Sequence, residues 1–256
     1  MTHFDNDIAM EINSERIGVR EVMRFAKSKD RGAFIKDIAD AVLIRQEARK
    51  LGICANDQEL QAAADSFRTS RELYEARATE SWLAVNYLSQ AEWEALLEDE
   101  VIRLKVRDVV TDHAVERYFA EQRLSFDGVT FSLLLVKEQS VAKELKAQII
   151  DDGADFHSLA RQYSIDYETR LAGGYAGFIR RTAMEPEVEA AIFGVQPGTT
   201  IGPIETRCGW QLLKLEALHL AILGDAMREE IKSILFENWL DGQRLKAKIR
   251  VTLWAA

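Results

Sequence analysis

Apolar residues recur at helical spacing through the first half of the chain. Between residues 34 and 48 they form a wide stripe, and Gly52 predicts where that helix ends. Three polar side chains at capping positions predict further helix starts: Asn56 and Ser89, each followed three residues later by Glu, and Thr111. The leucines and aromatic residues of these helices are expected to pack in a core. The first half is therefore expected to be helical.

The period of the pattern changes near residue 128. A β-rich run over 129–136 is followed by helical patterns over 141–150 and 156–163, and by a closing strand over 210–215. A long helix is then expected over 226–245, before a short alternating strand at 249–254. The residues expected to face inward on that helix are Met227, Ile231, Ile234, Leu235 and Trp239.

Glycine and proline mark the boundary between the two patterns. Residues 1–127 hold three glycines and no proline, whereas 128–217 hold nine of the fourteen glycines and all three prolines. Because turns need these residues, the second stretch is expected to be a compact α/β unit. We predict an α+β protein whose helical domain, 1–125, is completed by 218–256 and interrupted by an inserted domain at 126–217.

Composition excludes several kinds of partner. A net charge of −9 argues against nucleic acid and anionic membranes, which need clustered Lys and Arg. No apolar run reaches membrane-spanning length, and the N-terminus lacks a secretory signal pattern, so we expect a cytoplasmic chain. Cys54 and Cys208 are expected to be buried thiols. The four histidines, His3, His113, His157 and His219, are expected at the surface; no metal and no cofactor is expected.

Six segments between 125 and 217 together resemble the parvulin family of peptidylprolyl isomerases, in its order and at its spacing. They are 131–136, Gly153–Phe156, Tyr163–Asp166, Gly173–Phe178, Met184–Phe193, and Pro197–Gly198 with Gly202–Pro203 and Thr206–Trp210. The flanks, at 11–17, 46–60, 110–115 and the C-terminal helix and strand, are similar to the helical chaperone domain of SurA-like and PrsA-like foldases. The resemblance implies a four-stranded antiparallel sheet with helices in the inserted domain.

The resemblance also implies a site. Rotation about an X–Pro bond must break amide resonance, a barrier of about 18–20 kcal/mol, so a catalyst needs only to bind the twisted amide best. By motif position, Met184, Val188 and Phe193 would line a proline pocket. Asp166 would lie beside the substrate carbonyl, and Thr206 would supply a hydroxyl to the polar network.

This chain departs from the family at four positions. Leu133 and Gln211 stand where parvulins usually have two histidines. Ala176 replaces a leucine, and Val188 replaces an aromatic residue. Leucine makes no hydrogen bond, and glutamine does not titrate, so the pocket is looser and its polar network thinner. If binding the twisted amide supplies most of the catalysis, a weakened activity survives; if the network sets the geometry of Asp166, activity is lost.

Three functions follow from this reading. The first is a parvulin-type peptidylprolyl cis-trans isomerase and foldase-chaperone that acts on proline-containing unfolded or precursor polypeptides. The second is a non-catalytic chaperone, whose helical domain, with Trp82 and Trp93 near a cleft, holds peptides while the parvulin unit is a second dock. The third is an adaptor in a peptide export or maturation assembly.

Overall fold

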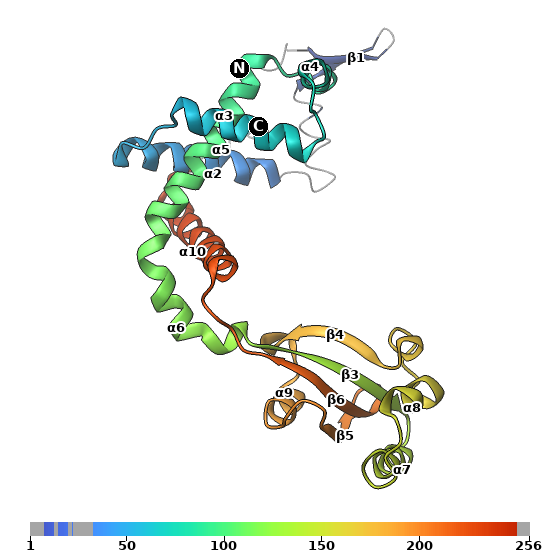
Figure 1. Ribbon diagram of the computed structural model, residues 1–256. Helices are drawn as coiled ribbons and strands as arrows, with labels where there is room; N and C mark the ends of the chain where they lie inside the picture. The colour runs from blue at the N-terminus through green and yellow to red at the C-terminus, as the bar shows by residue number, and fades with distance from the viewer. Residues whose placement is uncertain (1–7, 13–14, 20–21, 23–32, 250–256) are drawn as a thin grey trace. The chain divides into compact units, whose positions relative to one another are not determined.

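The computed structural model describes residues 8–12, 15–19, 22 and 33–249 (Figure 1). The chain forms two compact units, Met1–Val115 with Arg228–Ala256, and Glu116–Met227. Apart from Ile249, the strand expected at 249–254 lies outside the described residues, and so does His3. None of the helices in the described ranges is long and apolar enough to cross a membrane.

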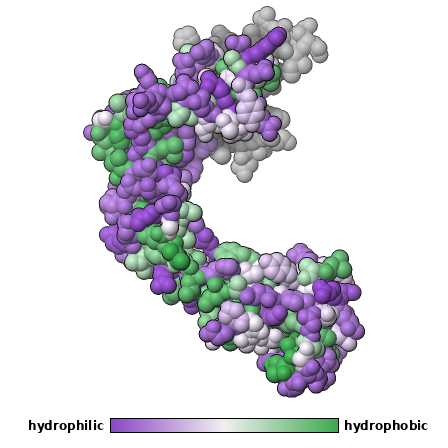
Figure 2. Space-filling model, in the orientation of Figure 1, coloured by the Kyte–Doolittle hydropathy of each residue, from purple (hydrophilic) through white to green (hydrophobic). Residues whose placement is uncertain are grey.

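The first unit is mainly helical. Its strands β1 (Ile8–Ile12) and β2 (Glu15–Gly18) form an antiparallel pair. Its helices are α2 (Ala33–Leu51), α3 (Asp57–Ser70), α4 (Ala76–Val85), α5 (Gln90–Thr111), the 3-10 turn η2 (Asp112–Ala114), and most of α10 (Asp225–Lys246). The face visible in Figure 2 is mainly hydrophilic over this unit, interrupted by apolar patches.

The helix ends follow the local sequence closely. Gly52 ends α2 with a φ of +66°, which a glycine adopts without strain. Both predicted capping boxes form, with the side chains of Asn56 and Ser89 each accepting from the backbone N–H of the Glu three residues on. The predicted cap at Thr111 is wrong: α5 continues through Thr111, whose hydroxyl donates to the carbonyl of Arg107 at 2.7 Å.

Two apolar clusters hold the helical unit together. One joins α2, α5 and α10 through Ile44, Ala48, Val106, Phe236 and Leu240. The other joins α3, α4 and α5 through Ala64, Leu83, Trp93 and Leu97. On α10 the buried residues are Ile231, Phe236 and Leu240, so of the five expected to face inward only Ile231 is fully buried.

The second unit is the predicted α/β fold. After α6 (Val115–Phe126), its elements are β3 (Gly128–Val136), α7 (Gln139–Ile150), α8 (Phe156–Tyr163), η3 (Arg170–Ala172), β4 (Tyr175–Arg180), η4 (Arg181–Ala183), α9 (Pro186–Ile192), β5 (Thr200–Thr206) and β6 (Gly209–His219). The strands form one antiparallel sheet in the order β4-β3-β6-β5, which confirms the fold class.

The sheet separates two cores because successive side chains on a strand point to opposite faces. Leu134, Val136 and Leu212 pack against α7 and α8. On the other face, Leu213 and Leu215 pack with Ile192 of α9, and Leu133 and Met184 lie at the edge of this second cluster.

Both cysteines differ from expectation. Cys54 and Cys208 are free thiols, and both are exposed rather than buried. Cys54 follows α2, and Cys208 lies in the turn between β5 and β6. Each lies in a connection between elements, where the chain runs along the surface.

Candidate functional site

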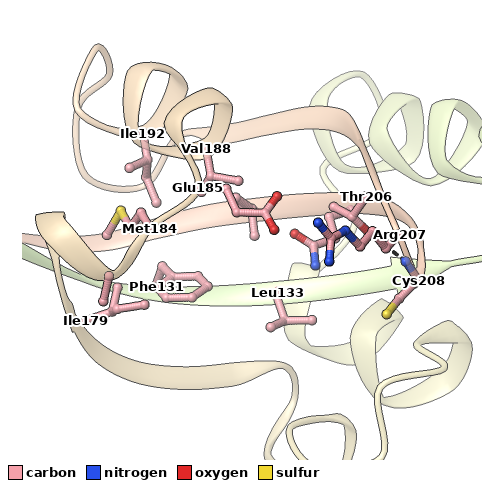
Figure 3. A pocket seen from close by; sticks show the side chains of 13 residues that line it. Phe131, Leu133, Ile179, Met184, Glu185, Val188, Ile192, Thr206, Arg207 and Cys208 are labelled. Carbon is pink, nitrogen blue, oxygen red and sulfur yellow. Dashed lines mark hydrogen bonds between the residues drawn. The ribbon is translucent and has the colours of Figure 1, made fainter.

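A cavity of about 340 Å³ opens between the sheet and α9 (Figure 3). Five of the residues predicted for the site line it, namely Leu133, Met184, Val188, Thr206 and Gln211. They come from three separate parts of the chain: β3, the η4–α9 connection with α9, and the β5–β6 hairpin. The structure therefore brings together most of the predicted set.

The floor and one wall of the cavity are apolar. Phe131 and Leu133 are two residues apart on β3, so their side chains emerge on the same face of the sheet. Figure 3 shows these two side chains on one side of the cavity and Met184 and Val188 on the other. Such a cavity suits a compact apolar group.

The rim is polar. Arg207 and Cys208 lie in the β5–β6 turn, and Glu185 precedes α9. The hydroxyl of Thr206 donates to the carbonyl of Gly209 at 2.8 Å and accepts from the backbone N–H of Cys208 at 3.3 Å. The hydroxyl proton of Thr206 is therefore engaged in a hydrogen bond within the β5–β6 hairpin.

Gln211 is the polar side chain best placed to meet a ligand. It pairs with Leu135 of β3 and Ile204 of β5, so it stands in the middle of the sheet beside the apolar floor. Within the part of the chain that the structure describes, its side-chain amide makes no hydrogen bond. An amide offers both donors and an acceptor, so it can bind a peptide carbonyl or N–H.

Phe193 does not line the cavity but supports it. Its ring packs in the same cluster as Met184 and Val188. The guanidinium of Arg181 lies 4.5 Å from the ring centroid, and its Nε donates to Glu189 at 2.6 Å. This arrangement holds α9 against the sheet.

Asp166 also lies outside the cavity lining, in the turn after α8. Its carboxylate accepts hydrogen bonds from the backbone N–H of Thr169, at 3.1 Å, and from the Thr169 hydroxyl. The Thr169 carbonyl accepts from Gly174 at 2.9 Å, and the Gly174 carbonyl accepts from Leu133 at 2.8 Å. Hydrogen bonds therefore connect Asp166 to the strand residue that lines the cavity.

Only glycine fits at position 174. Its φ is +84°, and a Cβ there would lie 2.2 Å from the carbonyl oxygen of Leu133. This close approach lets the turn before β4 bind β3. Ala176, on β4, is exposed and is not part of the cavity lining.

His157 was expected at the surface, but it is half-buried on the α8 face of the sheet. Its Nδ1 lies 3.0 Å from the Gly173 carbonyl oxygen, and its Nε2 lies 3.2 Å from Lys214 Nζ and 3.4 Å from Glu216 Oε1. Glu216 in turn accepts from the Ser132 hydroxyl at 2.8 Å. The expectation failed because the strand order brings β6 under α8, which no local pattern reveals.

The cavity is also lined by residues that were not predicted for the site, among them Phe131, Ile179, Glu185 and Arg207. The alternation of β3 was the signal available for Phe131, since it lies two residues before Leu133. Glu185 and Arg207 lie within two of the motif segments without having been assigned to the site, and nothing local indicated Ile179. No group of three potential metal ligands occurs among the residues described.

Fold and cavity together define a domain with an apolar cavity, bordered by polar side chains, on one face of a small antiparallel sheet. Residues 136–217 match the family model described as "Rotamase: PPIC-type PPIASE domain". The chain therefore contains a domain of the parvulin (PPIC) type, as the motifs predicted.

Similarity extends beyond that domain. The chain is 27% identical over 197 residues to the foldase protein PrsA of Caldanaerobacter subterraneus, which is 77% of this chain and 60% of that protein. It is 28% identical over 185 residues to PrsA of Geobacillus kaustophilus, 71% of this chain and 64% of that protein. These alignments are longer than the parvulin segment, so the predicted kinship of the flanks with PrsA-like foldases is confirmed. The chain spans less than two thirds of the length of these relatives.

Solved structures of such proteins are similar to this one. The crystal structure of PrsA from Bacillus anthracis is 21% identical, with a TM-score of 0.47, and the match covers 86% of this chain and 99% of that one. A structure from Campylobacter jejuni, reported for the SurA-like chaperones PEB4 and Cj1289, is 20% identical with a TM-score of 0.39, covering 96% of this chain and all of that one, 100%.

Proposed function

We propose that this chain is a parvulin-type peptidylprolyl cis-trans isomerase that acts on proline-containing segments of unfolded or precursor polypeptides. The observation that carries the proposal is the apolar cavity with the free amide of Gln211 beside it, in a domain of the PPIC type. The cytoplasmic location and the preference for proline remain predictions.

The mechanism needs no covalent step. The proline ring would enter the apolar cavity between Leu133 and Met184, and the preceding carbonyl would lie at the polar rim. As the amide twists it loses resonance, and its nitrogen becomes pyramidal and more basic. A site that fits this shape lowers the barrier because it binds the twisted form more tightly than the planar forms.

Gln211 would orient the substrate in this mechanism. Its amide N–H can donate to the carbonyl oxygen before the proline, whose direction changes during rotation. Leu133 contributes apolar contact and no hydrogen bond. Neither family histidine is therefore present, and Gln211 replaces one of them with a neutral amide; we propose that catalysis is weak for this reason.

Asp166 enters the proposal as a positioning residue. Its hydrogen bonds to Thr169 hold the turn that binds β3 at Leu133. Removing the carboxylate would loosen the floor of the cavity without removing any group that contacts the substrate.

Exchange NMR on a proline-containing peptide titrated with the full chain tests the proposal, because it reports binding and isomerisation separately. We expect faster cis-trans exchange in proportion to the amount of protein added. Binding without any acceleration at high protein concentration would contradict the isomerase.

That contrary result would favour the second function, a chaperone that holds polypeptides without catalysis. A specific observation supports it: a second cavity, of about 720 Å³, lies in the helical unit between α3 and α5. Suppression of client aggregation by the chain, retained when residues 128–217 are deleted, would support holding by this unit. Loss of all suppression in a deletion variant that stays helical would count against it.

A further inference from the structure

The cavity of the helical unit is a groove with two different ends. Helices α3 and α5 run antiparallel, so that Glu59 meets Lys105 at one end, with Nζ 2.7 Å from Oε1. At the other end Phe67 meets Trp93, with ring centroids 5.6 Å apart. From residue 59 to residue 70 the α3 wall is about 16 Å long, the length of about five extended residues.

The walls of the groove leave room for a ligand. The α3 wall includes the small residues Ala62, Ala63 and Ser66, whereas α5 contributes leucines. Leu96 is 54% exposed and Leu104 is 37% exposed. Both lie on the groove-facing side of α5, so an apolar ligand would remove their side chains from water.

The aromatic end carries a buried donor, at Trp93, without an acceptor in the described ranges, and the guanidinium of Arg71, whose Nη1 donates to the Ser70 hydroxyl at 3.1 Å. The Trp93 side chain is buried, and its indole N–H has no hydrogen-bond partner among the described residues. The guanidinium of Arg71 lies 4.0 Å from the ring centroid of Phe67 and 5.4 Å from that of Trp82. The indole nitrogen is itself buried, so the donor that faces the groove at this end is the guanidinium of Arg71.

The charges along the groove are almost all neutralised. Four charged residues line it, Glu59, Arg71, Glu100 and Lys105. Glu59 and Lys105 pair with each other, and the hydrogen bond from Lys105 lowers the pKa of Glu59. Glu100 pairs with Arg103 at 2.8 Å. Arg71 has no carboxylate partner in the described part of the chain, so the groove carries one uncompensated positive charge, at its aromatic end.

We propose that this groove binds an extended apolar peptide segment that carries a carboxylate at the Arg71 end. An extended segment keeps its backbone carbonyls free to accept hydrogen bonds from the guanidinium of Arg71. The carboxylate, from an acidic side chain or a C-terminus, matches the lone charge of Arg71. The inference rests on the holding function proposed above, and it names the class of segment that is held.

Three peptides test the proposal on the full chain. Each has the same five apolar residues and ends in Glu, Gln or Lys, with both termini blocked, and binding is measured by calorimetry. We expect the Glu peptide to bind about two- to fivefold more tightly than the Gln peptide, and the Lys peptide more weakly than both. Added salt should reduce these differences because it screens the charges.

Substitutions test whether Arg71 causes the difference in affinity between the three peptides. Arg71→Glu should reverse the order of the three peptides, and Arg71→Gln should abolish it, which covers the case in which the first variant folds poorly. Arg77→Glu makes the same charge change at an exposed position on α4 outside the groove, so it should leave the order unchanged. Leu96→Ala should weaken all three peptides alike.

The outcomes separate this inference from the function on which it rests. Equal affinities for the three peptides, or an order that Arg71→Glu leaves unchanged, would overturn the acidic preference while holding stands. Failure of every peptide to bind would overturn both. Binding lost in Met184→Ala but kept in Leu96→Ala would place the peptides in the other cavity and would also overturn the inference.

Discussion

Individual residues decide what the α/β cavity can do. Thr206 and Gln211 both line it, yet the Thr206 hydroxyl is bonded within its hairpin and the Gln211 amide is free. The position of a residue in a motif does not show whether its side chain is hydrogen-bonded or free, because that depends on which groups lie next to it in the folded chain. The same is true of Asp166, which the motif would place beside a substrate and which binds Thr169 here.

Gln211→Leu tests the free amide. We expect peptide exchange to slow by about two- to tenfold, because one hydrogen bond of about 0.5–1.5 kcal/mol to the substrate is lost. Exchange NMR measures it, with Gln148→Leu on α7 as the matched control. An unchanged exchange rate in Gln211→Leu would remove this residue from the mechanism.

Asp166 allows a test of positioning. We expect Asp166→Ala to slow exchange and to lower the unfolding free energy by about 1 kcal/mol, since the turn at Thr169 loses its acceptor. Asp166→Asn keeps an acceptor oxygen and should restore most of both. If Asn restored stability but not exchange, the carboxylate charge itself would be needed, and the positioning role would be wrong.

At the scale of elements, local signals set most helix and strand limits. Capping boxes at Asn56 and Ser89 and the glycine at 52 act within a few residues, so the sequence predicted them correctly. Thr111 has the right residue type for a cap, but it is the last residue of α5, and its hydroxyl donates back to the Arg107 carbonyl instead of capping the turn that follows. Burial on α10 depends on α2 and α5, which its own sequence does not specify.

The Ser89 cap supports the groove, because α5 carries Trp93 and Leu96. Ser89→Ala should lower the unfolding free energy by about 1 kcal/mol, as loss of an N-cap does. Chemical denaturation followed by circular dichroism measures the change. Ser233→Ala, inside α10, is the control, since its hydroxyl bonds back to Glu229 within the helix and caps nothing; equal losses in the two variants would count against the cap.

The same cap predicts a dependence on pH. Hydrogen bonds from the Ser89 side chain and backbone lower the pKa of Glu92 below its ordinary value of 4.5. A carboxyl whose folded pKa is lowered stabilises the fold above the unfolded pKa, and the contribution disappears as pH falls through the folded value. Wild type should therefore be more stable than Glu92→Gln at pH 7, and the difference should close below about pH 4.5.

Urea unfolding between pH 7 and pH 3 measures this difference. Glu98→Gln removes one negative charge from an exposed position on the same helix, outside the cap. A constant difference between wild type and Glu92→Gln across the range would contradict the assignment.

At the scale of the whole molecule, each unit has its own apolar clusters. Leu212 lies in the cluster under α7 and α8, and Leu240 lies in the cluster of α2, α5 and α10. The insertion of one unit into the other could be predicted because glycine, proline and strand patterns are confined to the middle of the chain.

Core substitutions should act within their own unit. Leu212→Ala is expected to cost about 2–5 kcal/mol and to increase hydrogen exchange mainly in 116–227, because its contacts lie there. Leu240→Ala is expected to act mainly in the helical unit. An equal loss of protection in both units from either substitution would contradict separate cores.

The sequence alone determined the α+β class, the inserted parvulin-type module, both capping boxes and the five residues that meet in the α/β cavity. The capping boxes follow from residue types a few positions apart. The class, the module and the cavity residues follow from the order and spacing of motifs that a family shares. Only the tertiary structure decided that Thr206 is engaged and Gln211 free, that Asp166 acts through a turn, and that His157 lies against Lys214 and Glu216. The tertiary structure also decided the groove at Arg71. Hydrogen bonds and ion pairs between distant segments exist only once the chain has folded.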